Sequence, residues 1–172
     1  MPTRPFRFDP EKGLEVLLYV SNRIKNKNIY WVLKTPYFAD KYHLEAAGRS
    51  ICGDHYIAMR SGPVPSNLYD IVKDVRDLRR ISAFVTKAHA AFEIQGRKFI
   101  PKRDADLQYF SKSDLESLDR AMAEIEDLSF SALKKKSHGP DYEAADADDV
   151  IPFDAFVKTI PNGELLLKAL RS

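Results

Sequence analysis

Four polar side chains that could do chemistry lie close together in the sequence: Asp40, His43, Asp54 and His55. Asp40 and His43 have a spacing of three, which places both on one face of a helix. Asp54 and His55 follow Gly53, and a turn at this glycine would fold them back over that helix. Carboxylates and imidazoles bind divalent metals, so the four residues are a candidate metal centre for hydrolysis.

The ordinary interpretation of the same residues is two surface histidines and two aspartates that cap turns. No HExxH motif and no paired cysteine or histidine motif accompanies them, which favours the ordinary interpretation. Cys52, the one cysteine, is a candidate nucleophile with His43 or His55 as its base. A lone cysteine is more often a small buried hydrophobe, so we rank it below the metal site. We therefore expect no enzymatic activity and no cofactor, with a metal-dependent hydrolase as an alternative.

The segments that must position these residues have the periodicity of helices. Asp9 and Pro10 form a helix start, because the aspartate can cap free N–H groups and proline fits the first helical position. A second helix is expected over about residues 29–47. Pro36 lies inside it and predicts a kink or a break near Thr35.

The middle of the chain carries the β signals. Residues 56–59 are short and apolar, as is typical of a strand. Residues 62–65 read Gly-Pro-Val-Pro and predict a stiff turn, followed by a helix that Ser66 caps. Residues 92–100 alternate around a Gln-Gly turn and predict a hairpin.

The last third of the chain is predicted to be helical around one acidic stretch. Residues 113–116 have the pattern of a capping box and predict a helix to about residue 127. Residues 141–149 hold five acids and predict a solvated loop or a frayed turn, and a last helix is expected over about residues 164–170. The predicted class is mainly α with a small antiparallel β element (α+β), folded as one compact domain over residues 1–172, with a core of about 6–140.

Composition narrows the class of protein. The chain has 172 residues, the length of one domain, with 44% hydrophobic and 30% charged residues, which excludes wholesale disorder. One cysteine excludes an internal disulfide and indicates a reducing compartment. No apolar run reaches the roughly 18 residues of a membrane span, and no secretory signal is visible. We expect a cytoplasmic protein that does not bind membranes.

A nucleic-acid-binding regulator is the second alternative. Residues 97–98 and 102–103 place four basic side chains on or after the predicted hairpin. Phe92, Phe99 and Tyr109 lie near them in sequence, and such a mixture can stack bases. The 27 basic and 25 acidic residues leave a net charge of only +2, so direct binding of nucleic acid is not the favoured interpretation.

Several short motifs occur in a characteristic order. They are Lys12-Gly13-Leu14, Tyr37-Phe38-Ala39-Asp40, Gly48-Arg49-Ser50-Ile51, Gly53-Asp54-x-Tyr56, Gly62-Pro63-Val64-Pro65, Phe110-Ser111 and Ser137-His138. The series resembles the Panacea domain family, which includes SocA-like antitoxins and phage-associated proteins. The resemblance spans roughly residues 6–140.

The resemblance implies a compact, mostly helical domain with a small β element. It implies an antitoxin that binds a toxin protein directly, usually one encoded beside it. It also implies a variant of this role, in which an adaptor delivers the toxin to a Clp-type protease with its unfoldase.

Three surfaces would then be available to a toxin: the stiff segment 62–65, the hairpin around Gly96 and the acidic segment 141–149. A protein interface needs aromatic or arginine anchors. The candidate partner-binding residues are Tyr56, Arg60, Gly62, Pro63, Val64, Pro65, Tyr69 and Phe99.

Overall fold

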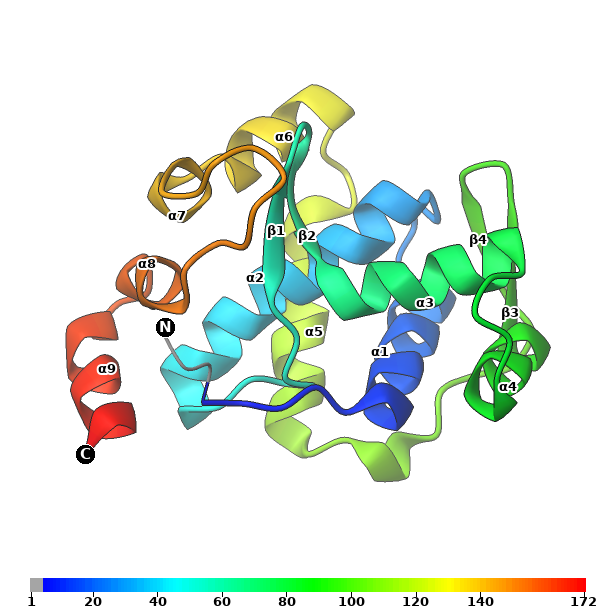
Figure 1. Cartoon of the computed structure of the whole chain (residues 1–172), viewed down its shortest axis with the longest axis horizontal. Coiled ribbons are helices and arrows are strands. Elements are labelled where there is room, and N and C mark those ends of the chain that lie inside the picture. The colour runs from blue at the N-terminus through cyan, green and yellow to red at the C-terminus, as the bar shows by residue number, and fades with distance from the viewer. Residues whose placement is uncertain (1–4) are drawn as a thin grey trace.

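Two long helices form the frame of the fold: α1 (Pro10–Arg23) and α2 (Ile29–Ala47). The computed structural model describes residues 5–172. Helix α2 crosses the molecule and packs against α1 and most extensively against α5 (Lys112–Ile125), as Figure 1 shows. The helices surround two small antiparallel sheets, which confirms the predicted α+β class.

The predicted start of α1 and the predicted bounds of α2 are confirmed. The Asp9 carboxylate accepts a hydrogen bond from the Lys12 N–H, and the αL conformation of Gly48 ends α2. Of the kink or break predicted near Thr35, the break does not occur, because α2 runs through Pro36 as one helix. Residues 31–40 are all buried, so the surrounding structure holds the helix together across the proline.

The first sheet joins β1 (Tyr56–Met59) to β2 (Gly62–Pro65), with Met59 opposite Gly62. The strand over residues 56–59 is confirmed, but residues 62–65 form a strand rather than the predicted turn. Prolines are tolerated in this short sheet because β2 lies at its edge. The second edge of β1 is also bonded, since the Ile151 N–H donates to the Tyr56 carbonyl at 2.8 Å.

The second sheet is the predicted hairpin of β3 (Phe92–Gln95) and β4 (Lys98–Pro101). Helix α3 (Ser66–Asp77) lies between the two sheets. The capping box of α5 is formed by Ser111 and Asp114, so the one predicted over residues 113–116 is displaced by two positions.

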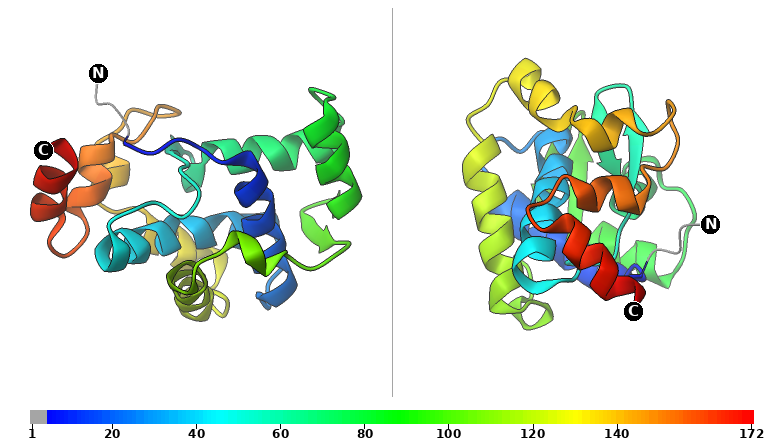
Figure 2. Two further views of the ribbon diagram at one scale, coloured as in Figure 1. Left: turned by 90° about the horizontal axis from the view of Figure 1, so that it is seen from below. Right: turned by 90° about the vertical axis from the view of Figure 1, so that its left-hand side faces the viewer.

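The remaining helices are shorter. The last one, α9, confirms the expectation for residues 164–170, whereas α4, α7 and α8 were not predicted. Figure 2 shows α8 and α9 at one end of the molecule and α4 with the β3–β4 hairpin at the other. These elements are α4 (Ala83–Ala91), the 3-10 turn η1 (Leu107–Tyr109), α6 (Phe130–Ser137), α7 (Pro140–Glu143), α8 (Phe153–Lys158) and α9 (Gly163–Arg171). Within residues 5–172, no helix is long and apolar enough to cross a membrane.

Two glycines with positive φ provide a matched test of the loop that leads into β1. Gly53 has φ 83° and Gly96 has φ 63°. A Cβ at Gly53 would overlap the backbone carbonyl of Arg7, whereas a Cβ at Gly96 would meet nothing within 4 Å. We expect Gly96→Ala to lower the free energy of unfolding by about 1 kcal/mol and Gly53→Ala by at least about 3 kcal/mol. Urea unfolding measures both, and equal losses would contradict the close approach of residue 7.

Candidate functional site

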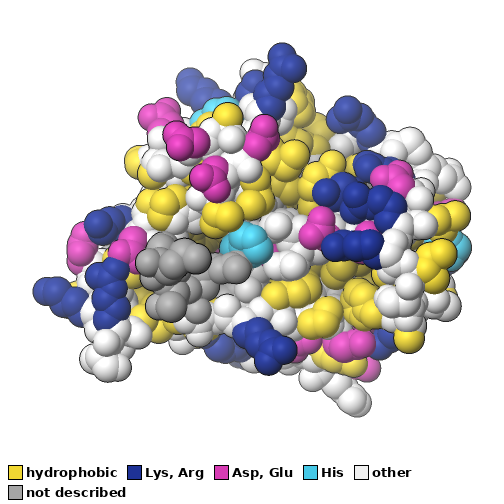
Figure 3. Space-filling model, viewed as in Figure 1, with side chains coloured by type: hydrophobic (Ala, Val, Ile, Leu, Met, Phe, Trp, Pro, Cys, Tyr) yellow, Lys and Arg dark blue, Asp and Glu magenta, His cyan; other side chains and the backbone are white. Residues whose placement is uncertain are grey.

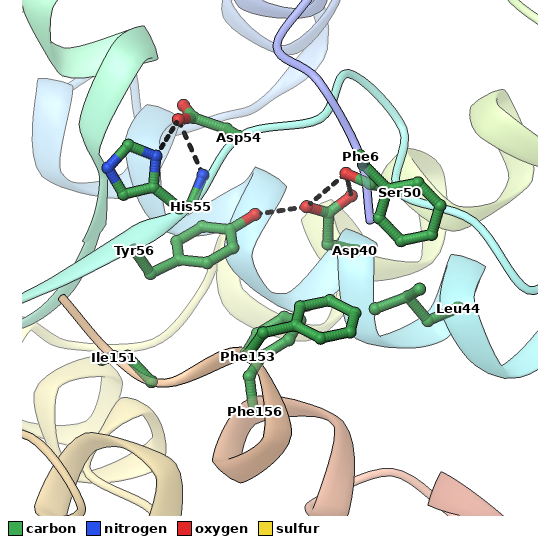
Figure 4. Close-up of a pocket in the computed structure, with 10 residues that line it drawn as sticks. All are labelled: Phe6, Asp40, Leu44, Ser50, Asp54, His55, Tyr56, Ile151, Phe153 and Phe156. Carbon is green, nitrogen blue, oxygen red and sulfur yellow. Dashed lines mark hydrogen bonds and ion pairs between the residues drawn. The ribbon is translucent and has the colours of Figure 1, made fainter. Parts of the chain in front are cut away.

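The carboxylate of Asp40 joins three segments of the chain at the centre of the molecule. It accepts hydrogen bonds from the Ile51 N–H at 2.8 Å, the Tyr56 hydroxyl at 2.6 Å and the Ser50 hydroxyl at 3.1 Å. Figure 4 shows Tyr56 and Ser50 pointing at Asp40 from opposite sides. The residue is 3% exposed, and burial raises the pKa of its carboxyl to about 6. Asp40 therefore fixes the loop and β1 on α2.

Asp54 caps α3 from a distance. Its carboxylate accepts hydrogen bonds from the N–H groups of Asn67 and Leu68, both at 2.9 Å. The predicted cap, Ser66, makes no such bond, because the position before the helix is Pro65 and the free N–H groups are satisfied by Asp54 instead. The Nδ1 atom of His55 lies 3.7 Å from the same carboxylate.

His43 belongs to another part of the interior. Its Nδ1 atom lies 2.7 Å from the Arg49 carbonyl oxygen, and its Nε2 atom lies 2.9 Å from the Ser113 hydroxyl. Burial is the main cause that lowers the pKa of its imidazole. His43 thus ties α2 to the start of α5.

The four candidate metal ligands are therefore not assembled into one site. In the part of the chain that the structure describes, no three histidine, cysteine, aspartate or glutamate side chains are arranged to hold a metal ion. Asp40, Asp54 and His55 do line one pocket, but its volume is about 30 Å³, room for about one or two water molecules. Cys52 is buried beside it, and burial raises the pKa of its thiol, which does not favour a thiolate nucleophile.

Five of the eight candidate partner-binding residues have buried positions. The ring of Tyr56 stacks on Phe156, with centroids 5.1 Å apart. Phe99 is fully buried against Phe92, with centroids 4.4 Å apart, so neither ring can stack a base as the nucleic-acid alternative requires. The buried candidates are Tyr56, Gly62, Pro63, Pro65 and Phe99. These five residues belong to the packed interior, because the first hairpin and the second are each packed on helices.

The other three candidates remain accessible: Arg60 is exposed, and Val64 and Tyr69 are half-buried. Arg60 stands at the turn of the β1–β2 hairpin and Tyr69 on the adjoining face of α3. These three residues keep the role of candidate contacts.

Side chains from two helices hold the tip of the β1–β2 hairpin by its carbonyl groups. The Tyr30 hydroxyl donates to the Ser61 carbonyl at 2.7 Å, and the Tyr142 hydroxyl donates to the Met59 carbonyl at 2.7 Å. The ammonium group of Lys34 donates to the Pro63 carbonyl. Lys34 is 1% exposed, and burial lowers its pKa to about 7. The hairpin is therefore held rigidly on α2 and α7.

A groove of about 230 Å³ lies beside this hairpin. Figure 3 shows hydrophobic side chains gathered there, with basic side chains around them. The sequence analysis identified the groove residues on the β1–β2 hairpin but not those on α2. No short-range sequence pattern indicates that Tyr30 contacts Ser61. The groove is lined by Asn28, Ile29, Tyr30, Leu33, Lys34, Met59, Arg60, Ser61, Val64, Tyr69 and Arg97.

The acidic segment 141–149 is only partly solvated. Asp141 is fully buried in α7, where it accepts a hydrogen bond from the Tyr37 hydroxyl and lies 3.2 Å from the ammonium of Lys41. The other four acids are exposed. The prediction of a solvated loop is therefore wrong for residue 141, since this carboxylate satisfies the buried hydroxyl of Tyr37 and pairs with the half-buried ammonium of Lys41.

The Asp40 network predicts a specific dependence of stability on pH. Between pH 3.8 and about 6 the folded protein holds a proton on Asp40 that the unfolded chain releases. The stability contributed by this carboxyl is therefore present below pH 3.8 and lost as the pH rises through about 6. We expect the stability difference between the wild type and Asp40→Asn to fall by about 3 kcal/mol over this window.

Urea unfolding at a series of pH values measures this difference. Tyr56→Phe is the companion variant: it removes a hydrogen bond that lowers the pKa, so its window should extend to higher pH. A difference that stays constant between pH 4 and pH 6 would show that burial does not raise the pKa of Asp40.

Comparison with known families gives a match over most of the chain. The family model described as antitoxin SocA-like, Panacea domain, matches residues 32–143. Comparisons with curated proteins and with solved structures give no match. The matched segment is most of the chain and contains both the Asp40 network and the β1–β2 hairpin. The chain therefore belongs to the SocA-like antitoxin family of Panacea domains.

Proposed function

We propose that the protein is an antitoxin that neutralises a cognate toxin by binding it directly through the groove beside the β1–β2 hairpin. The observation that carries this proposal is an apolar groove with an exposed arginine at its edge, in a domain of an antitoxin family. Arg60, Val64 and Tyr69 are the proposed contacts, and neutralisation takes place in the cytoplasm.

The rigidity of the hairpin supports this proposal. Three side chains hold its carbonyl groups, so little backbone entropy is lost when a partner binds. Tyrosine and arginine are enriched among the residues that dominate binding energy. A stable interface buries about 800 Å² on each partner, so the toxin would extend past the groove over α3 and the adjoining loops.

Binding rather than catalysis is the favoured class for this chain. Asp40, His43 and Asp54 each hold a loop or a helix end through their polar atoms. We propose that no catalytic residue and no cofactor is used, and that the chain acts as one domain, since α8 packs on α2.

The first test is to purify the tagged protein from its host and identify bound proteins by mass spectrometry. A stoichiometric small protein that is toxic when expressed alone is the expected result. An isolated protein with bound divalent metal would favour the hydrolase alternative instead.

Substitution of Tyr69 tests the proposed surface. Tyr69→Ala removes a half-buried ring from the groove, and we expect the affinity for the toxin to fall at least about tenfold. Tyr109→Ala is the control, because Tyr109 is 39% exposed on η1, away from the groove. Titration calorimetry measures both affinities. Equal affinities for the two variants would place the contact elsewhere.

The amount of toxin in cells that express both proteins separates two modes of neutralisation. A constant amount indicates blocking by binding alone. A reduced amount that recovers in cells without the Clp-type unfoldase indicates delivery to a protease.

A further inference from the structure

Most arginine side chains in residues 5–172 are paired with carboxylates. Of the eleven arginines in residues 5–172, eight form an ion pair within 4.0 Å. Within this part of the chain the unpaired ones are Arg7, Arg60 and Arg97. Two of the three, Arg60 and Arg97, line the same groove.

The two guanidinium groups stand on separate turns. Arg60 lies at the turn between β1 and β2, and Arg97 lies at the turn between β3 and β4. Figure 1 shows these turns on either side of the start of α2, which forms the floor of the groove. A segment lying in the groove would therefore pass between two free guanidinium groups.

The charge of the groove has one sign. Its charged lining residues are Lys34, Arg60 and Arg97, without an acid among the described residues. Lys34 already donates to the Pro63 carbonyl, so the arginines carry the free donors. Guanidinium groups bind carboxylates with two parallel hydrogen bonds, which makes a carboxylate the matching partner group.

The size of the groove also limits what fits. Its volume of about 230 Å³ is below the roughly 300–1,000 Å³ of most small-molecule sites. Tyr30, Leu33 and Tyr69 give it an apolar lining. One bulky apolar side chain is a better match for this space than a whole cofactor.

We propose that the groove binds an extended segment of the partner protein in which a bulky apolar side chain is flanked by aspartate or glutamate. The apolar side chain enters between Tyr30 and Tyr69, and the flanking carboxylates pair with Arg60 and Arg97. This proposal rests on the proposed function and specifies the chemistry of the toxin segment that is recognised.

A nucleic acid fits these features less well. A phosphate backbone is held by a row of exposed cations and its bases by exposed rings. Here the lining is largely apolar, and Phe92 and Phe99 are in the core. The net charge of +2 also gives little long-range attraction for a polyanion.

The test uses a phage-displayed library of random peptides, selected on the full-length protein. We expect the selected peptides to share an aromatic or large aliphatic residue with acids on both sides. The best peptide, synthesised with a fluorophore, is then titrated against the wild type and its variants by fluorescence anisotropy.

Charge reversal identifies the groups that bind the peptide. Arg60→Glu and Arg97→Glu should each weaken binding at least about tenfold. Replacing the peptide acids by lysine should restore part of the affinity for these two variants. Arg7→Glu is the matched control, since Arg7 is exposed and unpaired but lies outside the groove, and it should bind like the wild type. Thermal unfolding confirms that all three variants are folded.

Several results would overturn the inference. The selection could enrich no peptide, or it could enrich peptides that lack acidic residues. Alternatively, the three charge reversals could change peptide affinity equally. Binding of a single-stranded oligonucleotide that falls steeply with salt and is lost in Arg60→Glu would assign the groove to nucleic acid. The peptide selection needs no toxin, so a protein that neutralises a toxin but selects no acidic peptide would retain the proposed function and refute only this inference.

Discussion

The buried carboxylate of Asp40 is the constraint on which the other features depend. A carboxylate in the interior is costly unless its oxygens accept hydrogen bonds, and here donors from Ser50, Ile51 and Tyr56 supply them. These donors come from the loop after α2 and from β1. The arrangement of the loop that satisfies Asp40 also brings Gly53 against the N-terminal segment and places the Asp54 carboxylate at the first turn of α3. One buried charge thus determines where the first sheet and α3 begin.

Helix α2 repeats this principle along its length. Four of its buried polar side chains are each bonded to another segment: Lys34 to β2, Tyr37 to α7, Asp40 to the loop and β1, and His43 to the start of α5. Buried polar groups of this kind contribute less to stability than to specificity, because a misplaced segment would leave a donor or acceptor unpaired. The helix therefore selects one arrangement of the segments around it, which also explains why it stays continuous across Pro36.

The parts that sequence reasoning predicted are those determined by local signals. These signals act within a few residues: the helix caps at Asp9 and Gly48, and the alternation of apolar and polar residues around Gly96. The corresponding helices and the hairpin lie where they were predicted. The errors arise where a distant residue supplies a partner. Asp54 caps α3 in place of Ser66. Asp141 is buried, unlike the other acids of its segment, because it accepts a hydrogen bond from Tyr37. For the same reason, only three of the eight candidate contacts are accessible and the other five are buried. The local sequence does not distinguish Tyr56, which is bonded to α2, from Tyr69, which lines the groove.

The division between buried and accessible residues has a consequence for binding. The buried polar groups of α2 are used by the fold, whereas the groove also presents Arg60 and Arg97, which form no ion pair within residues 5–172. These two arginines stand on hairpin turns, where a substitution leaves the Asp40 network untouched. Under the proposed function, a change of turn residues alone would change the partner that is recognised, because the interior that positions the turns lies outside the proposed contact. The contacts that hold the β1–β2 hairpin in place are therefore compatible with substitutions at its tip.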